Sequence, residues 1–131
     1  MNITEFSRNR MMQTAKQWDV SREYFDPLYN YLVFGFVPGG FWTAVLANDF
    51  MSAIQRSHPS NRIEALKSVT GWIEEEFPAV SYGSYQMVRD WLSFTDLQRR
   101  SHLEAQGLIY TEQEEIMRGL KGERSQEPVL D

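Results

Sequence analysis

The sequence predicts an all-α protein, a compact bundle of about five helices around a central buried helix at residues 38–56. Apolar residues recur at helical spacing between turn signals, and 42% of the 131 residues are hydrophobic, which is enough for a packed core. A chain of this length normally folds as one domain. We expect a marginal helix or mobile arm at residues 1–20, a helical domain at 21–120 and a disordered tail at 121–131.

The helix expected at residues 38–56 begins at Pro38, whose fixed φ and missing N–H suit a first helical position. No further proline interrupts the chain before Ser57. At 100° per residue, apolar side chains fall on both sides of this helix: Trp42, Leu46, Phe50, Ala53 and Ile54 on one side, Phe41 and Val45 on the other. A helix that is apolar most of the way round is normally buried, so we place this one at the centre.

Two helical patterns precede the central helix. The first has an apolar stripe made of Met11, Met12, Ala15 and Trp18. It is either a marginal helix that docks through Trp18 or a mobile arm. The second is expected to begin at Asp26, an N-cap residue followed by Pro27, and to end at Gly35, a natural left-handed C-cap.

Three more helices are expected after the central one. Ser60 or Asn61 should cap the third helix of the domain, and Pro78 should end it. Its apolar face comprises Ile63, Leu66, Val69 or Thr70, Ile73 and Phe77.

Capping residues also mark the later helices. Ser84 should cap a helix that either runs to Gly107 or breaks near Ser93–Asp96. Thr111 and Glu114 form the sequence signature of a capping box for a last helix, Glu112–Leu120. The chain is polar beyond Lys121, so we expect the tail to be dispensable.

Composition and spacing argue against several classes of protein. The chain has no cysteine, so disulfides and zinc–thiolate sites are impossible, and its net charge of −5 makes a nucleic-acid partner unlikely. No apolar run is long enough to cross a membrane and no secretory signal is evident, so a cytoplasmic protein is expected. His58 and His102 have no carboxylates at metal-binding spacing, and no serine lies in a nucleophile elbow. We expect no enzyme activity, no catalytic residue, no metal and no cofactor.

The candidate binding residues are charged or aromatic. Asp49 is expected inside an otherwise apolar helix, where it either caps a neighbouring helix, pairs with an arginine such as Arg62, or forms a polar recognition spot ringed by aromatics. The run Glu74-Glu75-Glu76 is either a solvated face or an acidic docking patch for a basic partner. Trp42 and Tyr82 mark an aromatic surface that could serve instead of the acidic patch.

Part of the chain resembles a family of small, functionally uncharacterised bacteriophage and prophage proteins. Their pattern is Pro-Gly-x-Phe, then Ala-Val-Leu-x-Asn-Asp, an Asn-Arg pair, and Trp-Gly-Ser before a helix that contains a tryptophan. The matching residues are Pro38-Gly39-Gly40-Phe41, Ala44-Val45-Leu46-Ala47-Asn48-Asp49, Arg56, Asn61-Arg62, Tyr82-Gly83-Ser84 and Trp91. The match spans residues 36–92; it departs at Tyr82, where the family more often has tryptophan, and leaves residues 1–25 and 97–131 outside. The resemblance implies a viral gene product and supplies no activity.

Two functions follow as hypotheses. The first is a non-enzymatic protein-interaction module, a phage-encoded inhibitor that binds a host protein or complex such as a defence complex (in the manner of anti-CRISPR proteins) or a polymerase. The alternative is a nucleic-acid-associated accessory protein that uses a local basic patch, formed by Arg99 and Arg100 or by Arg8 and Arg10. Two arginines are a small footprint for nucleic acid, so the first hypothesis is preferred.

Overall fold

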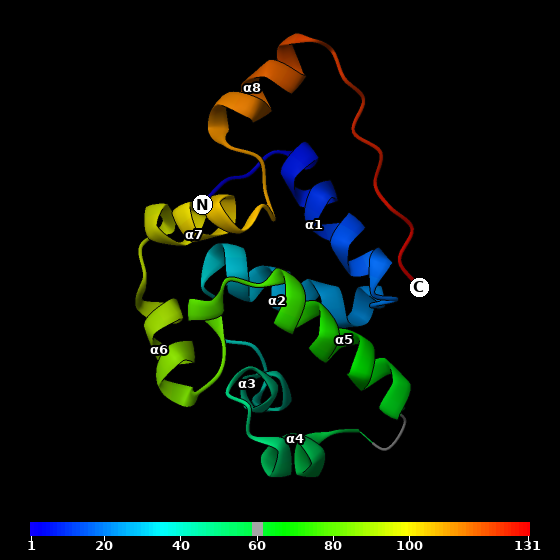
Figure 1. Ribbon diagram of the computed structural model, residues 1–131, viewed down its shortest axis with the longest axis vertical. Helices are drawn as coiled ribbons and strands as arrows, with labels where there is room; N and C mark the ends of the chain where they lie inside the picture. The colour runs from blue at the N-terminus through cyan, green and yellow to red at the C-terminus, as the bar shows by residue number, and fades with distance from the viewer. Residues whose placement is uncertain (59–61) are drawn as a thin grey trace.

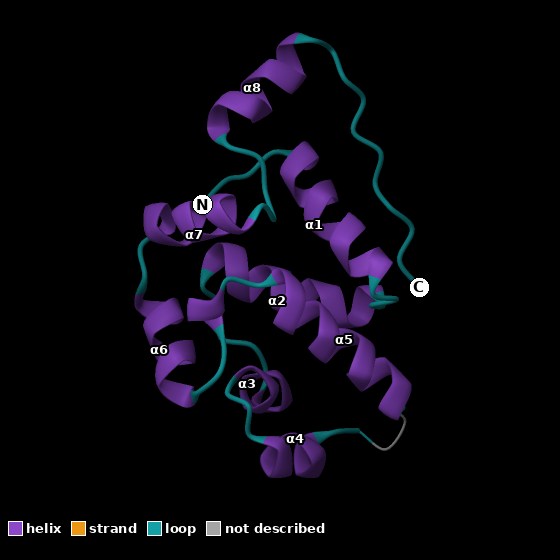
Figure 2. Ribbon diagram, viewed as in Figure 1, coloured by secondary structure: helices purple, strands orange, loops and turns teal. Residues whose placement is uncertain are grey.

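The computed structural model describes residues 1–58 and 62–131, and these residues form an all-helical protein (Figures 1 and 2). Within them the elements are α1 (Glu5–Gln17), α2 (Arg22–Phe34), α3 (Gly40–Leu46), α4 (Phe50–Arg56), α5 (Ile63–Glu76), a 3₁₀ turn (Ala79–Ser81), α6 (Tyr85–Ser93), α7 (Asp96–Gln106) and α8 (Glu112–Leu120). The all-α prediction is confirmed. The expected number of helices was too low, because two of the expected helices each divide in two and residues 1–20 contribute one more.

The helices are distributed along one long axis of the molecule. Helix α8 lies at one end of this axis and α4 at the other, with α1, α2 and α5 between them (Figure 1). Helix α2 occupies the centre and contributes a group of side chains with no exposed surface: Phe25, Leu28, Tyr31, Leu32 and Val33. Trp72 of α5 and Trp91 of α6 belong to the same core, and the indole N–H of Trp91 donates to the Tyr31 carbonyl at 3.1 Å.

Helix α2 begins earlier than the sequence predicts. Ser21 is its N-cap residue, so Pro27 lies inside the helix and not at its first position. A proline in the second turn removes one backbone hydrogen bond, and the helix continues because its apolar face is fully buried. The expected end is confirmed, since Gly35 adopts the left-handed conformation with φ of 67°.

The prediction of one central buried helix at residues 38–56 is wrong. The chain forms α3 and α4 with a break between them, where Asn48 has a positive φ of 60°. Asn tolerates the left-handed region better than most residues, and Asp49 then starts a new helix by accepting a hydrogen bond from the Ser52 N–H at 3.2 Å. The break turns α4 outward, and Phe50 is 70% exposed.

Helix α1 is part of the core, so the docked alternative holds and the mobile arm does not. Met11, Met12 and Ala15 have no exposed surface. Trp18 lies so close to Gly71 of α5 that a Cβ at that position would come within 2.7 Å of its ring. The absence of a side chain at Gly71 therefore lets α1 and α5 approach each other.

Helices α6, α7 and α8 each begin at a capping residue. The capping residues proposed for α5, Ser60 and Asn61, lie outside the described residues. Helix α5 ends at Glu76, just before the position where Pro78 was expected to stop it. Ser84 caps α6, and a capping box at Thr95 starts α7, so the helix expected from residue 85 breaks between Ser93 and Asp96. The capping box at Thr111 and the bounds of α8 are confirmed.

The tail differs from the disordered segment that its composition suggests. It runs alongside α1 in extended form (Figure 1). The Glu127 carboxylate accepts from Arg22 at 2.7 Å, Ser125 hydrogen-bonds to the Asn9 side chain, and the Asp131 carbonyl accepts from the Arg22 N–H at 2.8 Å. Leu130 packs against the core.

Deleting residues 125–131 is expected to lower the thermal midpoint measurably. The deletion removes the Leu130 packing and several hydrogen bonds, and each kcal/mol lost corresponds to roughly 3–6 °C in a domain of this size. Differential scanning calorimetry measures the shift. As a comparison, Glu127→Gln removes only exposed ion pairs and should change the midpoint by a degree or two at most, on the rough scale of such pairs. A full deletion that leaves the midpoint unchanged would mean that the tail is dispensable, as its composition suggests.

Candidate protein-binding groove

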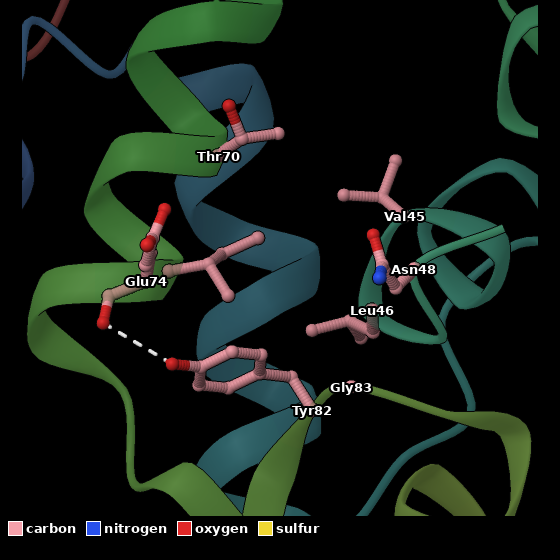
Figure 3. A pocket seen from close by; sticks show the side chains of 8 residues that line it. Val45, Leu46, Asn48, Thr70, Glu74, Tyr82 and Gly83 are labelled. Atoms are coloured by element: carbon pink, nitrogen blue, oxygen red, sulfur yellow. Dashed lines mark hydrogen bonds between the residues drawn. The ribbon is translucent and has the colours of Figure 1, made fainter. Parts of the chain in front are cut away.

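A surface pocket of about 370 Å³ lies between α3 and α5 (Figure 3). Its lining residues are Val45, Leu46, Asn48, Thr70, Ile73, Glu74, Tyr82 and Gly83. Figure 3 places Thr70 and Glu74 on one wall, from α5, and Val45, Leu46 and Asn48 on the opposite wall. Tyr82 closes the end next to Glu74.

The loop after α5 holds this end of the pocket in place. The Gly83 N–H donates to the Leu46 carbonyl at 2.7 Å, which ties the loop to the end of α3. The Tyr82 hydroxyl donates to the Glu74 carbonyl at 3.2 Å, so the ring spans from the loop to α5 (Figure 3). Gly83 has φ of 120°, a conformation that residues with a side chain rarely adopt.

A second pocket of about 410 Å³ adjoins the first and shares Val45 and Thr70 with it. It lies between α3, α4 and α5, and its walls are almost wholly apolar. Its lining residues are Phe41, Val45, Phe50, Ala53, Ile54, Ile63, Leu66, Lys67, Val69 and Thr70. The two pockets share Val45 and Thr70, and we call the pair of pockets the α3–α5 groove.

The rim of the α3–α5 groove carries large apolar side chains that face water. Phe50 is 70% exposed and Ile63 is 80% exposed, while Ile54 is about half exposed. Single exposed apolar residues are common, but a contiguous group around a hollow is typical of interaction sites. Helix α4 packs chiefly against α3, which leaves its outer face without a partner among the described helices.

The charges differ along the groove. The end that Tyr82 closes is acidic, because the last turn of α5 contains Glu74, Glu75 and Glu76. None of these three carboxylates forms an ion pair with a described residue. Carboxylates are disfavoured at the C-terminal end of a helix, where the dipole is negative. Toward the other end, Arg62 is the N-cap residue of α5 and Lys67 lines the apolar pocket, while Glu64 occupies the first turn of the helix. A partner that places a basic side chain beside Glu74, Glu75 and Glu76 would offset the unfavourable interaction of these carboxylates with the helix dipole.

The structure corrects the expectations for Asp49. Asp49 caps its own helix α4, and it neither caps a neighbouring helix nor pairs with Arg62. Its other oxygen accepts from the Tyr85 hydroxyl at 2.6 Å. The Tyr85 hydroxyl and then the Ser52 N–H hold the pKa of Asp49 below its usual value, so the carboxylate stays ionised. Asp49 therefore lies next to the groove, and both of its carboxylate oxygens already accept hydrogen bonds within the protein.

The other candidate residues separate into two groups. Tyr82 and Glu74 meet at the groove, with Glu75 exposed and Glu76 half-buried on the same helical turn. Trp42 is buried and makes edge-on contacts with Tyr24 and Phe41, at centroid distances of 5.3 and 4.7 Å. The location of Trp42 makes it a core residue, so it is not accessible to a partner.

Sequence reasoning missed the apolar walls of the groove. Phe50 and Ile54 were assigned to a buried helix and Ile63 to a buried face, whereas all three border the groove. The signal that could have found them is the pair Asn48-Asp49, which favours a break followed by an N-cap. A break there separates Phe50 and Ile54 from the buried register of α3.

The arginines of the alternative hypothesis all contact side chains of the protein itself, and Arg99 and Arg100 are buried. Arg99 is buried and bound to Asp96 at 2.5 Å, and Arg100 is buried and bound to Glu115 at 2.9 Å. Arg8 lies over the Tyr29 ring at 5.5 Å, and Arg10 lies over the Tyr110 ring at 4.4 Å. Neither pair forms an open basic surface, so the nucleic-acid hypothesis gains no support from them.

Residues 1–58 and 62–131 contain no group of three or more His, Asp or Glu side chains placed to hold a metal ion. Every helix in these ranges is too short or too polar to cross a lipid bilayer. Comparisons with protein families, with curated proteins and with solved structures find no match to this chain.

Proposed function

We propose that this protein is a non-enzymatic protein-interaction module and that the α3–α5 groove is its binding surface. The observation that carries the proposal is an open apolar groove that ends at unpaired carboxylates. The occupant we propose is an amphipathic helix of a partner protein. Its apolar face lies on the walls of the groove, and a lysine or arginine at one end meets Glu74 and Glu75.

The size and chemistry of the groove favour a helix as occupant. Helix-in-groove recognition requires an apolar trough that accepts side chains spaced along one face of a helix. The groove follows α5 from Ile63 to Glu74, a rise of about 16 Å, which corresponds to roughly three turns of a bound helix. Burial of apolar side chains supplies affinity, and the charged end fixes the orientation and speeds association.

The biological setting we propose rests on the resemblance of residues 36–92 to bacteriophage proteins. In that setting the module is a phage-encoded inhibitor that occupies a site on a host machine, such as a defence complex or a polymerase, in the host cytoplasm. A small acidic domain with one groove is compatible with this role, because blocking a partner requires binding and no chemical step.

Reversing the charge of Glu74, Glu75 and Glu76 to lysine is expected to slow association with the partner strongly at low salt. Charges at the rim of an interface act mainly on the association rate, and screening over about 8 Å at physiological ionic strength weakens them. The thermal midpoint should not fall, since Glu74 and Glu75 are exposed, Glu76 is half-buried, and lysines suit the negative C-terminal end of a helix. Affinity capture from a host lysate, with a nuclease-treated control, identifies the partner, and surface plasmon resonance at two salt concentrations gives the rates.

A control variant reverses Glu5 and Glu23, exposed carboxylates on α1 and α2 that do not line the groove. It should associate at nearly the wild-type rate. An unchanged low-salt rate in the groove variant, with the captured partner still bound, would refute the acidic end as a docking element. Loss of capture after nuclease treatment would support the nucleic-acid hypothesis instead.

A further inference from the structure

We propose that the α3–α5 groove of one molecule accepts helix α8 of a second copy, so that the protein self-associates head to tail. The inference rests on the groove of the proposed function and names a specific occupant for it. Helix α8 has the chemistry required of an occupant, because it is amphipathic and its charges are distributed in the complementary order.

The outer face of α8 carries three exposed apolar side chains around Gln113. Ile116 is 60% exposed and Leu120 is 77% exposed, with Met117 beside them. At 100° per residue these three side chains project away from Glu115, which is buried and faces the interior of the protein. Ile116 and Leu120 are four residues apart, so they are neighbours on the helix surface and can insert side by side.

Helix α8 also matches the groove in length. Its nine residues correspond to about 13 Å, and the groove extends for about 16 Å along α5. The side chains that line the wider pocket, including Phe50 and Ile63, are apolar and accessible. One helix of this length would cover both the apolar pocket and the end at Glu74.

The charges fix the direction in which α8 would lie. Its first turn carries Glu112 and Glu114, and the residue after its last turn is Lys121, which is exposed and forms no ion pair with a described residue. If α8 lies parallel to α5, Lys121 meets the carboxylates of Glu74 and Glu75. The first turn of α8, where Glu112 already lies 3.8 Å from Arg100 of its own chain, then lies toward Lys67. The antiparallel arrangement would place Glu112 and Glu114 beside Glu74 and Glu75.

The fold prevents α8 from occupying the groove of its own chain. Helix α8 lies at one end of the long axis, and α4, which forms a wall of the groove, lies at the other (Figure 1). The contact is therefore between two different surfaces of two molecules. Such a heterologous contact leaves a free groove on one molecule and a free α8 on the other, so assembly continues unless a ring closes.

The experiment uses two variants that each destroy one of the two surfaces. Ile54→Glu places a charge in the groove, and Leu120→Glu places one on α8; both positions are accessible, so the fold should survive, which circular dichroism checks. Analytical ultracentrifugation should show that the mass of the wild type rises with concentration and that each variant alone remains a monomer. An equal mixture of the two variants should form a heterodimer of twice the monomer mass and nothing larger, because one intact groove meets one intact α8.

Leu97→Glu serves as the control, since Leu97 of α7 is as exposed as Leu120 and lies on neither surface. It should assemble like the wild type. A wild type that stays monomeric over the whole concentration range overturns the proposal. So does a mixture without heterodimers, because that result means that the contact joins two like surfaces.

The outcome separates this inference from the proposed function. Leu120→Glu should still bind the captured partner, whereas Ile54→Glu should lose both the partner and self-association. A monomeric wild type whose Ile54→Glu variant loses the partner leaves the proposed function intact and refutes self-association. If the mixture forms heterodimers but Ile54→Glu still binds the partner normally, self-association is supported and the proposed function is refuted.

Discussion

Arg100→Ala is expected to lower the free energy of unfolding by about 3–5 kcal/mol, the usual cost of removing one member of a buried ion pair. Arg100 and Glu115 are both buried, with 2.9 Å between their charged atoms. The substitution leaves the Glu115 carboxylate in the interior without its cation. Chemical denaturation followed by far-UV circular dichroism measures the change.

The effect of Arg100→Ala should depend on pH in a defined direction. Burial raises the pKa of Glu115, but hydrogen bonds from Ser7, Thr4 and Arg100 outweigh it and hold the pKa below its ordinary value. The contribution of Glu115 to stability is therefore complete above its unfolded pKa and is lost as the pH falls through the folded pKa. Without Arg100 the pKa of Glu115 rises, so protonation relieves the orphaned charge. The gap in stability between wild type and variant should narrow as the pH falls, first where Glu115 of the variant takes up a proton and then where Glu115 of the wild type does.

The double variant Arg100→Met/Glu115→Leu distinguishes charge burial from packing. Replacing both charges with apolar groups removes the orphan, so the loss should be smaller than that of Arg100→Ala alone. Some loss remains, because the Ser7 and Thr4 hydroxyls both donate to Glu115 and would lose their acceptor. If Arg100→Ala is as stable as the wild type, the Arg100–Glu115 ion pair contributes nothing to the free energy of unfolding.

Leu46→Ala is expected to cost about 2–5 kcal/mol, the range for buried leucines. Leu46 ends α3, has no exposed surface and belongs to the main core cluster. The truncation leaves a cavity that the neighbouring helices can fill only in part. Urea unfolding at constant temperature gives the difference in free energy.

Phe50→Ala is the matched comparison, since Phe50 follows four residues later and would share a buried face with Leu46 in an unbroken helix. Phe50 is 70% exposed, so its truncation should cost well under 1 kcal/mol by the usual scale for surface positions. If both substitutions lowered the free energy of unfolding equally, Phe50 would be as buried as Leu46. That result would contradict the break at Asn48 and support one continuous buried helix.

Local signals predicted the ends of several helices well. The cap at Ser84, the capping box of Thr111 and Glu114, and the left-handed Gly35 depend on residues within one helical turn, and the structure confirms all three. Such signals act through the backbone N–H and C=O groups of the same helix, so the sequence contains all the information they need.

Features that depend on distant residues could not be predicted in this way. Arg100 resembled a surface cation until the fold brought Glu115 and the Asn2 carbonyl against it. The tail resembled a disordered segment because its attachments, Asn9 and Arg22, lie more than one hundred positions earlier in the chain. The sequence identified Glu74, Glu75 and Glu76 as either a solvated face or an acidic docking patch, and that choice stays a prediction. The groove beside them could not be predicted, because it results from the packing of three helices.

The buried network around Glu115 has a consequence for synthesis. The Ser7 hydroxyl finds its carboxylate partner 108 positions later in the chain. A ribosome that adds roughly 5–20 residues per second needs on the order of 5–20 s to cover that interval. Throughout this time α1 has emerged without the acceptor that its Ser7 and Thr4 hydroxyls require, and contacts this distant in sequence form slowly. The contacts of Thr4 and Ser7 with Glu115 thus form only after α8 has been made, later than the contacts of α1 with α5 can form.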